Sequence, residues 1–76
     1  MFYRVKWIIH GRDDSIVDPA DYPRISEAED FACSVLRYNP ADLWIEDEFG
    51  RRMAEKQEII DYCRRRGRKG VPRGQS

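Results

Sequence analysis

The sequence predicts an α+β fold, in which a three-stranded mixed sheet with the element order β-α-β-β-α packs against helix on one face. Three patterns predict it: a period-two alternation over residues 2–10, a helical apolar stripe over residues 27–38, and a hairpin pattern over residues 41–54. The chain has 76 residues, which suits one domain. We expect a single domain over residues 1–67 and a disordered basic tail over residues 68–76.

The first strand is expected to have one apolar side and one mixed side, because successive side chains of a strand point in opposite directions. The apolar side consists of Tyr3, Val5, Trp7 and Ile9, and the mixed side of Phe2, Arg4, Lys6, Ile8 and His10. Gly11 interrupts the pattern, and residues 11–25 contain two prolines and four aspartates. This composition indicates a long loop.

A helix over residues 27–38 is predicted from apolar residues at helical spacing, namely Ala28, Phe31, Ala32, Val35 and Leu36. Ser26 and Glu29 have the spacing of a capping box, and Asn39-Pro40 is a stop signal. The strands on either side of this helix are expected to be parallel, joined by a right-handed crossover.

Residues 41–54 predict a hairpin whose turn has Gly50 in the left-handed conformation. The expected register places Asp47 opposite Arg51, Glu46 opposite Arg52 and Ile45 opposite Met53.

A second helix is predicted from Glu55 onward, with Gly67 as its stop. The expected core is Val5, Trp7, Ile9, Phe31, Val35, Leu36, Leu43, Ile45, Met53, Ile59 and Ile60.

Charge is unevenly distributed although the formal net charge is zero. All 14 acidic residues lie at or before Asp61, together with eight basic residues, so this part carries −6. The residues after Asp61 include six bases and no acid, which are Arg64, Arg65, Arg66, Arg68, Lys69 and Arg73. An acidic domain with a basic end is the most distinctive feature of the composition.

No catalytic constellation, metal site or cofactor is expected. His10 is the single histidine, and nothing in the sequence brings it to Cys33, Cys63 or a carboxylate. The sequence has no glycine-rich phosphate loop and no HExxH motif. The acidic residues between Asp13 and Asp21 lack the spacing of an EF-hand. We therefore expect a protein that is not an enzyme.

The two cysteines are too few for a disulfide scaffold, and we expect Cys33 as a partly exposed thiol and Cys63 in the core. The longest apolar run, Trp7-Ile8-Ile9, is too short to span a membrane, and the first six residues lack the core of a signal peptide. A cytoplasmic, reducing location is the expected default.

Two functions remain open. The first is a protein-interaction or self-associating module, a homodimer included, whose candidate partner surface is Phe2, Arg4, Lys6, Ile8, Trp44 and Arg52. The alternative is nucleic-acid binding through the six basic residues after Asp61. A third hypothesis is a monomer without a partner surface, in which the second helix covers Trp44.

The segments Ser-Glu-Ala-Glu-Asp-Phe-Ala and Asp-Leu-Trp-Ile-Glu-Asp-Glu-Phe-Gly-Arg-Arg, after an opening strand with a tryptophan, resemble small uncharacterised bacterial domains of β-α-β-β order. The resemblance covers residues 2–54. It implies a compact α+β fold and no assigned activity.

Overall fold

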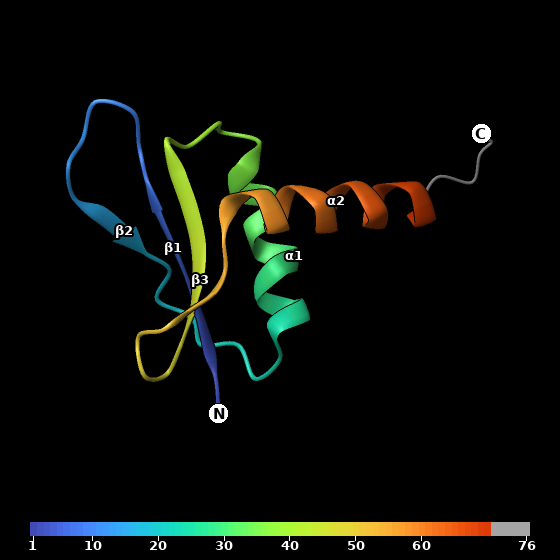
Figure 1. Cartoon of the computed structure of the whole chain (residues 1–76), viewed down its shortest axis with the longest axis horizontal. Coiled ribbons are helices and arrows are strands. Elements are labelled where there is room, and N and C mark those ends of the chain that lie inside the picture. The colour runs from blue at the N-terminus through green and yellow to red at the C-terminus, as the bar shows by residue number, and fades with distance from the viewer. Residues whose placement is uncertain (71–76) are drawn as a thin grey trace.

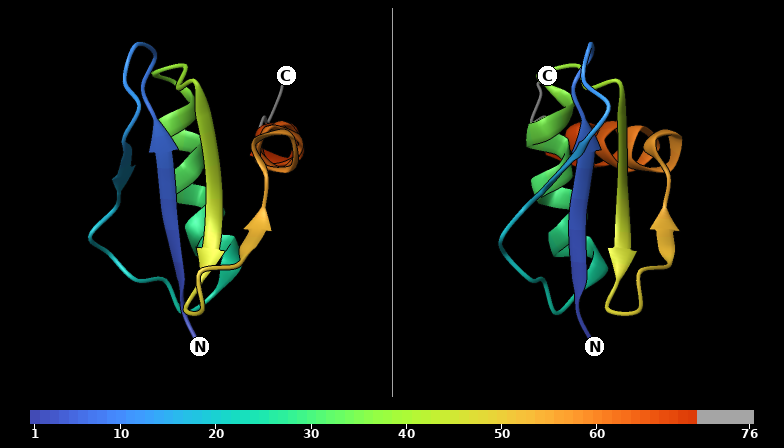
Figure 2. Two further views of the ribbon diagram at one scale, coloured as in Figure 1. Left: turned by 60° about the vertical axis from the view of Figure 1, so that its left-hand side comes forward. Right: turned by 90° about the vertical axis from the view of Figure 1, so that its left-hand side faces the viewer.

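The chain forms a four-stranded antiparallel sheet and two helices, which confirms the α+β class (Figure 1). The computed structural model describes residues 1–70, with side chains described for residues 1–66. The elements are β1 (Tyr3–Ile8), β2 (Ser15–Val17), α1 (Ile25–Leu36), β3 (Asp42–Asp47), β4 (Arg52–Ala54) and α2 (Lys56–Gly70). The strand order is β2-β1-β3-β4, and both helices lie on one side of the sheet (Figure 2). The prediction of three strands in a mixed sheet is wrong.

The strand absent from the prediction, β2, explains why the sheet is antiparallel. It pairs with β1 through Trp7 opposite Ile16, inside the segment expected to be a loop. Because β2 reverses the chain before α1 begins, α1 runs in the same direction as β1. The chain then returns along β3 antiparallel to β1, and the expected parallel crossover does not form.

The β1–β3 ladder divides the sheet into two faces with different chemistry. On the face that carries the helices, which we call the helix face, Val5 lies opposite Ile45 and Trp7 opposite Leu43. On the other side, which we call the outer face, Lys6 lies opposite Trp44. The alternation predicted for the first strand is therefore confirmed.

Helix α1 begins at Ile25, earlier than predicted, and its N-cap is Arg24, which makes no side-chain capping bond. The predicted capping box is therefore wrong, because Ser26 already lies inside the helix. Ala28 and Ala32 are fully buried, and their small side chains let α1 approach the sheet closely. After the helix ends, Asn39 adopts a positive φ of 52°, in agreement with the expected stop.

The β3–β4 turn is organised by Asp47, a buried carboxylate that accepts hydrogen bonds from the backbone N–H groups of Phe49 and Arg51 and pairs with the Arg51 side chain. Gly50 has a φ of 82°, as predicted. Glu46 lies opposite Arg52 as expected, but a bulge then places Ala54 opposite Ile45. The bulge exposes 43% of Met53, so the predicted Ile45–Met53 pair is wrong.

Helix α2 continues to Gly70, past the glycine expected to end it, and crosses α1 (Figure 1). A disulfide joins Cys33 of α1 to Cys63 of α2, with 5.8 Å between their Cα atoms. The expectation of two separate thiols is wrong, because the crossing of the helices brings together cysteines 30 residues apart in the sequence. The end of the proposed tail, residues 71–76, lies outside the described residues.

The core lies between the helix face and the two helices and consists of Val5, Ala28, Ala32, Val35, Leu43, Ile45, Ala54 and Ile59. Trp7, Phe31 and Leu36 pack against it as partly buried residues. Of the core residues predicted from the sequence, Ile9 and Met53 are wrong, since 43% of each is exposed. Ile9 lies one residue beyond the end of β1.

Leu43→Ala should destabilise the domain by ~2–5 kcal/mol, because it leaves a cavity in a fully buried position. Ile9→Ala should cost less than about 1 kcal/mol, because much of that side chain is in water already. Urea unfolding of both variants measures the difference. Equal losses would contradict the observed boundary of the core.

Candidate functional site

An apolar groove lies on the helix face, between the end of β1 and α1. It has a volume of about 470 Å³ and is lined by Trp7, Ile9, Phe31, Ser34, Val35, Tyr38 and Pro40. These residues come from β1 and the turn after it, from α1, and from the segment that follows the helix. The residues of α1 that line it form a different stripe from Cys33, which faces α2. The groove and the α1–α2 contact therefore use separate sides of α1.

The inner wall of the groove is held by a row of aromatic rings. The Phe31 ring lies 6.1 Å from the Trp7 ring in a tilted arrangement and 6.0 Å from the Tyr22 ring in a stacked one, measured between centroids. Both geometries are favourable for aromatic pairs. Phe31 is consequently fixed between β1 and the segment that precedes α1, and the groove is a preformed feature of the fold.

Tyr22 anchors this row through a hydrogen bond to Asp18. Its hydroxyl donates to Asp18 Oδ2 at 2.6 Å, and the same carboxylate accepts the backbone N–H of Ala20 at 3.2 Å. Burial, reinforced by the hydrogen bond and the negative charge of Asp18, raises the pKa of Tyr22 to about 12. The phenol thus remains a neutral donor at physiological pH, and its ring stays behind Phe31.

The rim of the groove exposes apolar surface to solvent. Tyr38 is 86% exposed and Ile9 43% exposed. The polar side-chain atoms of the lining are the hydroxyls of Ser34 and Tyr38 and the indole nitrogen of Trp7, and none of the lining residues is charged. An apolar group would bury surface there without leaving a charge unpaired.

On the outer face, charged side chains pair with one another and cover Trp44. Lys6 pairs with Glu46 at 2.8 Å, and the Trp44 indole N–H donates to the same carboxylate at 2.8 Å. Burial opposes ionisation of Glu46, but the hydrogen bonds from Lys6 and Trp44 outweigh it and lower the pKa of Glu46. The Arg52 guanidinium lies 4.0 Å from the centroid of the Trp44 ring. Trp44 is left only 6% exposed.

The structure brings the predicted partner surface together, but not as an apolar patch. Arg4, Lys6, Ile8, Trp44 and Arg52 lie on the outer face, and Arg4 lies over the ring of Phe2 at 5.3 Å. Arg4 is also paired with Asp21 at 2.8 Å. Whether this surface binds a partner stays a prediction.

The candidate nucleic-acid residues that the structure describes lie in the C-terminal half of α2 (Figure 1). Arg64, Arg65 and Arg66 are exposed, and Arg66 pairs with Asp30 of α1 at 3.1 Å. Arg68 and Lys69 belong to the same helix, whereas Arg73 lies outside the described residues.

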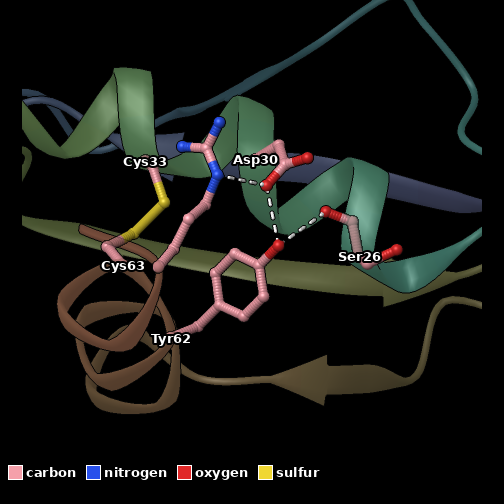
Figure 3. Close-up of a disulfide and its surroundings, with 6 residues drawn as sticks. Ser26, Asp30, Cys33, Tyr62 and Cys63 are labelled. Atoms are coloured by element: carbon pink, nitrogen blue, oxygen red, sulfur yellow. Dashed lines mark hydrogen bonds and ion pairs between the residues drawn. A yellow bond between two sulfur atoms is a disulfide. The ribbon is translucent and has the colours of Figure 1, made fainter. Parts of the chain in front are cut away.

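The junction of the two helices combines the disulfide with a hydrogen-bonded tyrosine (Figure 3). The Tyr62 hydroxyl lies 2.7 Å from Asp30 Oδ1 and 3.5 Å from the carbonyl oxygen of Ser26. The hydrogen bond to Asp30, followed by partial burial, raises the pKa of Tyr62. Three residues of α2, Tyr62, Cys63 and Arg66, therefore fasten it to α1.

The residues considered for catalysis are not assembled into a site. His10 is exposed beyond the end of β1, and both cysteines are in the disulfide. Within residues 1–70, no three histidine, cysteine, aspartate or glutamate side chains come together as metal ligands. Neither helix of that part is long and apolar enough to cross a membrane.

Comparison of the chain with protein-family models, with curated proteins and with solved structures finds no match. The geometry of the groove is therefore the basis for a function. From the sequence, Trp7, Ile9, Phe31 and Val35 were predicted as core residues and Pro40 as part of the helix stop, whereas Ser34 and Tyr38 were assigned no role. The sequence signal for Tyr38 was its position seven residues after Phe31, which continues the apolar stripe of the helix.

Tyr22 should titrate near pH 12 instead of its ordinary value near 10. Because the folded-state pKa is raised, the stability from its neutral form is fully present below about pH 10 and is lost as the pH rises to about 12. NMR of ¹³Cζ-labelled tyrosine measures this, with Tyr22→Phe to assign the signal. A midpoint near pH 10 would contradict the burial of Tyr22 together with its hydrogen bond to Asp18.

Proposed function

We propose that this protein is a small protein-interaction module that receives apolar side chains of a partner protein in the groove between β1 and α1. The observation that supports the proposal is the preformed apolar groove of about 470 Å³ with an exposed tyrosine at its rim. Exposed apolar surface of this kind marks interaction sites on small soluble domains.

The lining favours a protein segment over a metabolite. Sites for metabolites and cofactors combine apolar walls with several convergent polar or charged groups that fix the orientation of the ligand. This groove offers few polar groups and no charged side chain. Aromatic and aliphatic side chains of a partner protein do not need polar or charged groups in the groove, because their affinity comes from burial in a pocket that excludes water.

The groove is also a better candidate than the outer face. Binding to the outer face would require removal of the Lys6–Glu46 pair and the Arg52–Trp44 stack from water, or their rearrangement. Binding in the groove displaces water from surface that makes no ion pairs. We therefore propose the groove as the principal site.

Nucleic-acid binding is the second candidate function, and one structural feature favours it. Arg64, Arg65 and Arg66 are consecutive and exposed on α2, the helix whose C-terminal end extends away from the sheet (Figure 1). Exposed arginines on one helix can contact a phosphate backbone and release its counterions. We also propose that the protein is not an enzyme and that it is located in the cytoplasm.

Ser34→Arg should abolish binding of apolar segments, because it places a long charged side chain on the wall of the groove. The probe is a library of random linear peptides displayed on phage and selected against the wild-type protein. We expect selected peptides to share aromatic or aliphatic anchors and to lose at least about tenfold in affinity for Ser34→Arg, which corresponds to ~1.4 kcal/mol.

Gln57→Arg on α2 is the matched control, since it adds the same charge at an exposed helical position outside the groove. Sedimentation velocity of the wild type identifies self-association, in which a second copy is the partner. The proposal fails if selection yields no enriched peptides and the protein is monomeric, or if binding is insensitive to Ser34→Arg.

Nucleic-acid binding predicts a steep salt dependence for random single- and double-stranded oligonucleotides. The double variant Arg64→Gln/Arg65→Gln should reduce the slope of log K against log salt by about 0.7–0.9 for each phosphate that the variant no longer neutralises. Arg24→Gln/Arg37→Gln changes the charge equally at exposed positions around α1 and should leave the slope unchanged. No binding at low salt would exclude this second function.

A further inference from the structure

The two halves of α2 are held by very different interactions. The first half contains Ile59, which is fully buried in the core, and Lys56, whose ammonium donates to the carbonyl oxygen of Pro40 at 2.9 Å. The carboxylate of Glu58 also accepts the backbone N–H of Glu55, which caps the first turn. This half is therefore part of the folded core.

The second half, residues 64–70, has the sequence Arg-Arg-Arg-Gly-Arg-Lys-Gly and no apolar residue with which to dock. Its like charges lie three and four positions apart, where they repel one another on a helix. A glycine inside a helix costs a further ~1 kcal/mol relative to alanine. Arg66 pairs with Asp30, but both side chains are about half exposed, and exposed pairs of this kind contribute little.

The Cys33–Cys63 disulfide lies at the boundary between these halves. It fixes the last residue of α2 before the basic run against α1, next to the hydrogen bond from Tyr62 to Asp30 (Figure 3). Without the disulfide, this turn of α2 would be held to α1 only by the Tyr62–Asp30 hydrogen bond and the exposed Arg66–Asp30 ion pair.

We propose that the Cys33–Cys63 pair is a reversible thiol–disulfide switch that anchors the base of the basic half of α2, which stays helical when the pair is oxidised and unwinds when it is reduced. Reduction by a glutathione-type thiol breaks the Sγ–Sγ bond in two exchange steps. The pair gains two electrons and two protons and becomes two thiols, while two reductant thiols become one disulfide. Oxidation by the corresponding disulfide is the reverse reaction.

Both cysteines are partly exposed, so a small thiol can reach the bond. The rest of the domain does not depend on the bond for its contacts, because the core residues of β1, β3 and α1 are buried against one another and against Ile59. The switch is therefore local, and it rests on neither of the two proposed functions.

Hydrogen–deuterium exchange of the full chain, read by mass spectrometry with and without a dithiol reductant, tests the proposal. In the reduced protein, backbone amides of residues 63–70 should exchange at least about tenfold faster, whereas those of β1, β3 and α1 should keep their protection. Reoxidation with oxidised glutathione should restore the original rates.

The double variant Cys33→Ser/Cys63→Ser is the control, and it should show the fast exchange of residues 63–70 under both conditions. Unchanged exchange of the wild type on reduction would overturn the proposal. So would loss of protection throughout the domain, which would make the bond a global support, or failure of the two thiols to form the bond with oxidised glutathione.

Discussion

The antiparallel pairing of β1 with β3 is the constraint on which the other features of the structure depend. Six consecutive residue pairs, from Tyr3 opposite Asp47 to Ile8 opposite Asp42, set the register. That register sends Val5, Leu43 and Ile45 to the helix face, and Lys6 and Trp44 to the outer face. A shift of one residue would exchange the two faces and put charges into the core. The groove, the ion pairs and the position of α1 all follow from this one ladder.

A domain of this size has little buried surface, and two features outside the core add contacts at its periphery. A chain of this length buries only about 60% of the surface that it exposes when unfolded. On the outer face, charged side chains cover Trp44 and extend the buried area without a third layer. Between the helices, the Cys33–Cys63 bond joins positions 30 residues apart and holds the second helix against the first at the base of the basic run. The groove stays open because α2 is joined to α1 at Cys33, on a different side of α1 from Phe31 and Ser34.

The sequence predicted local features well and long-range ones poorly. The first strand, both helices and the hairpin were each predicted from periodicity, because that signal lies in neighbouring residues. The short strand Ser15–Val17 was missed because three residues are too few to show a period. Without this strand, β3 was predicted to run parallel to β1, whereas the two are antiparallel. The disulfide depends on how two helices cross, and the groove depends on which side of α1 stays uncovered. The spacing of residues in the sequence does not determine how two helices cross or which side of a helix is left uncovered. It did show that the apolar stripe extends from Phe31 to Tyr38.

The proposed function requires that the groove on the helix face is open to solvent and that the outer face is closed. The two tryptophans report on the two faces, since Trp7 lines the groove and Trp44 lies under Arg52. NMR of the wild-type protein with ¹⁵N- and ¹³C-labelled tryptophan, in the presence of a neutral gadolinium chelate, measures the access of solvent to both rings. We expect stronger broadening of the Trp7 ring signals, with the Trp44 indole N–H protected by its hydrogen bond to Glu46. Stronger broadening of Trp44 would contradict this expectation.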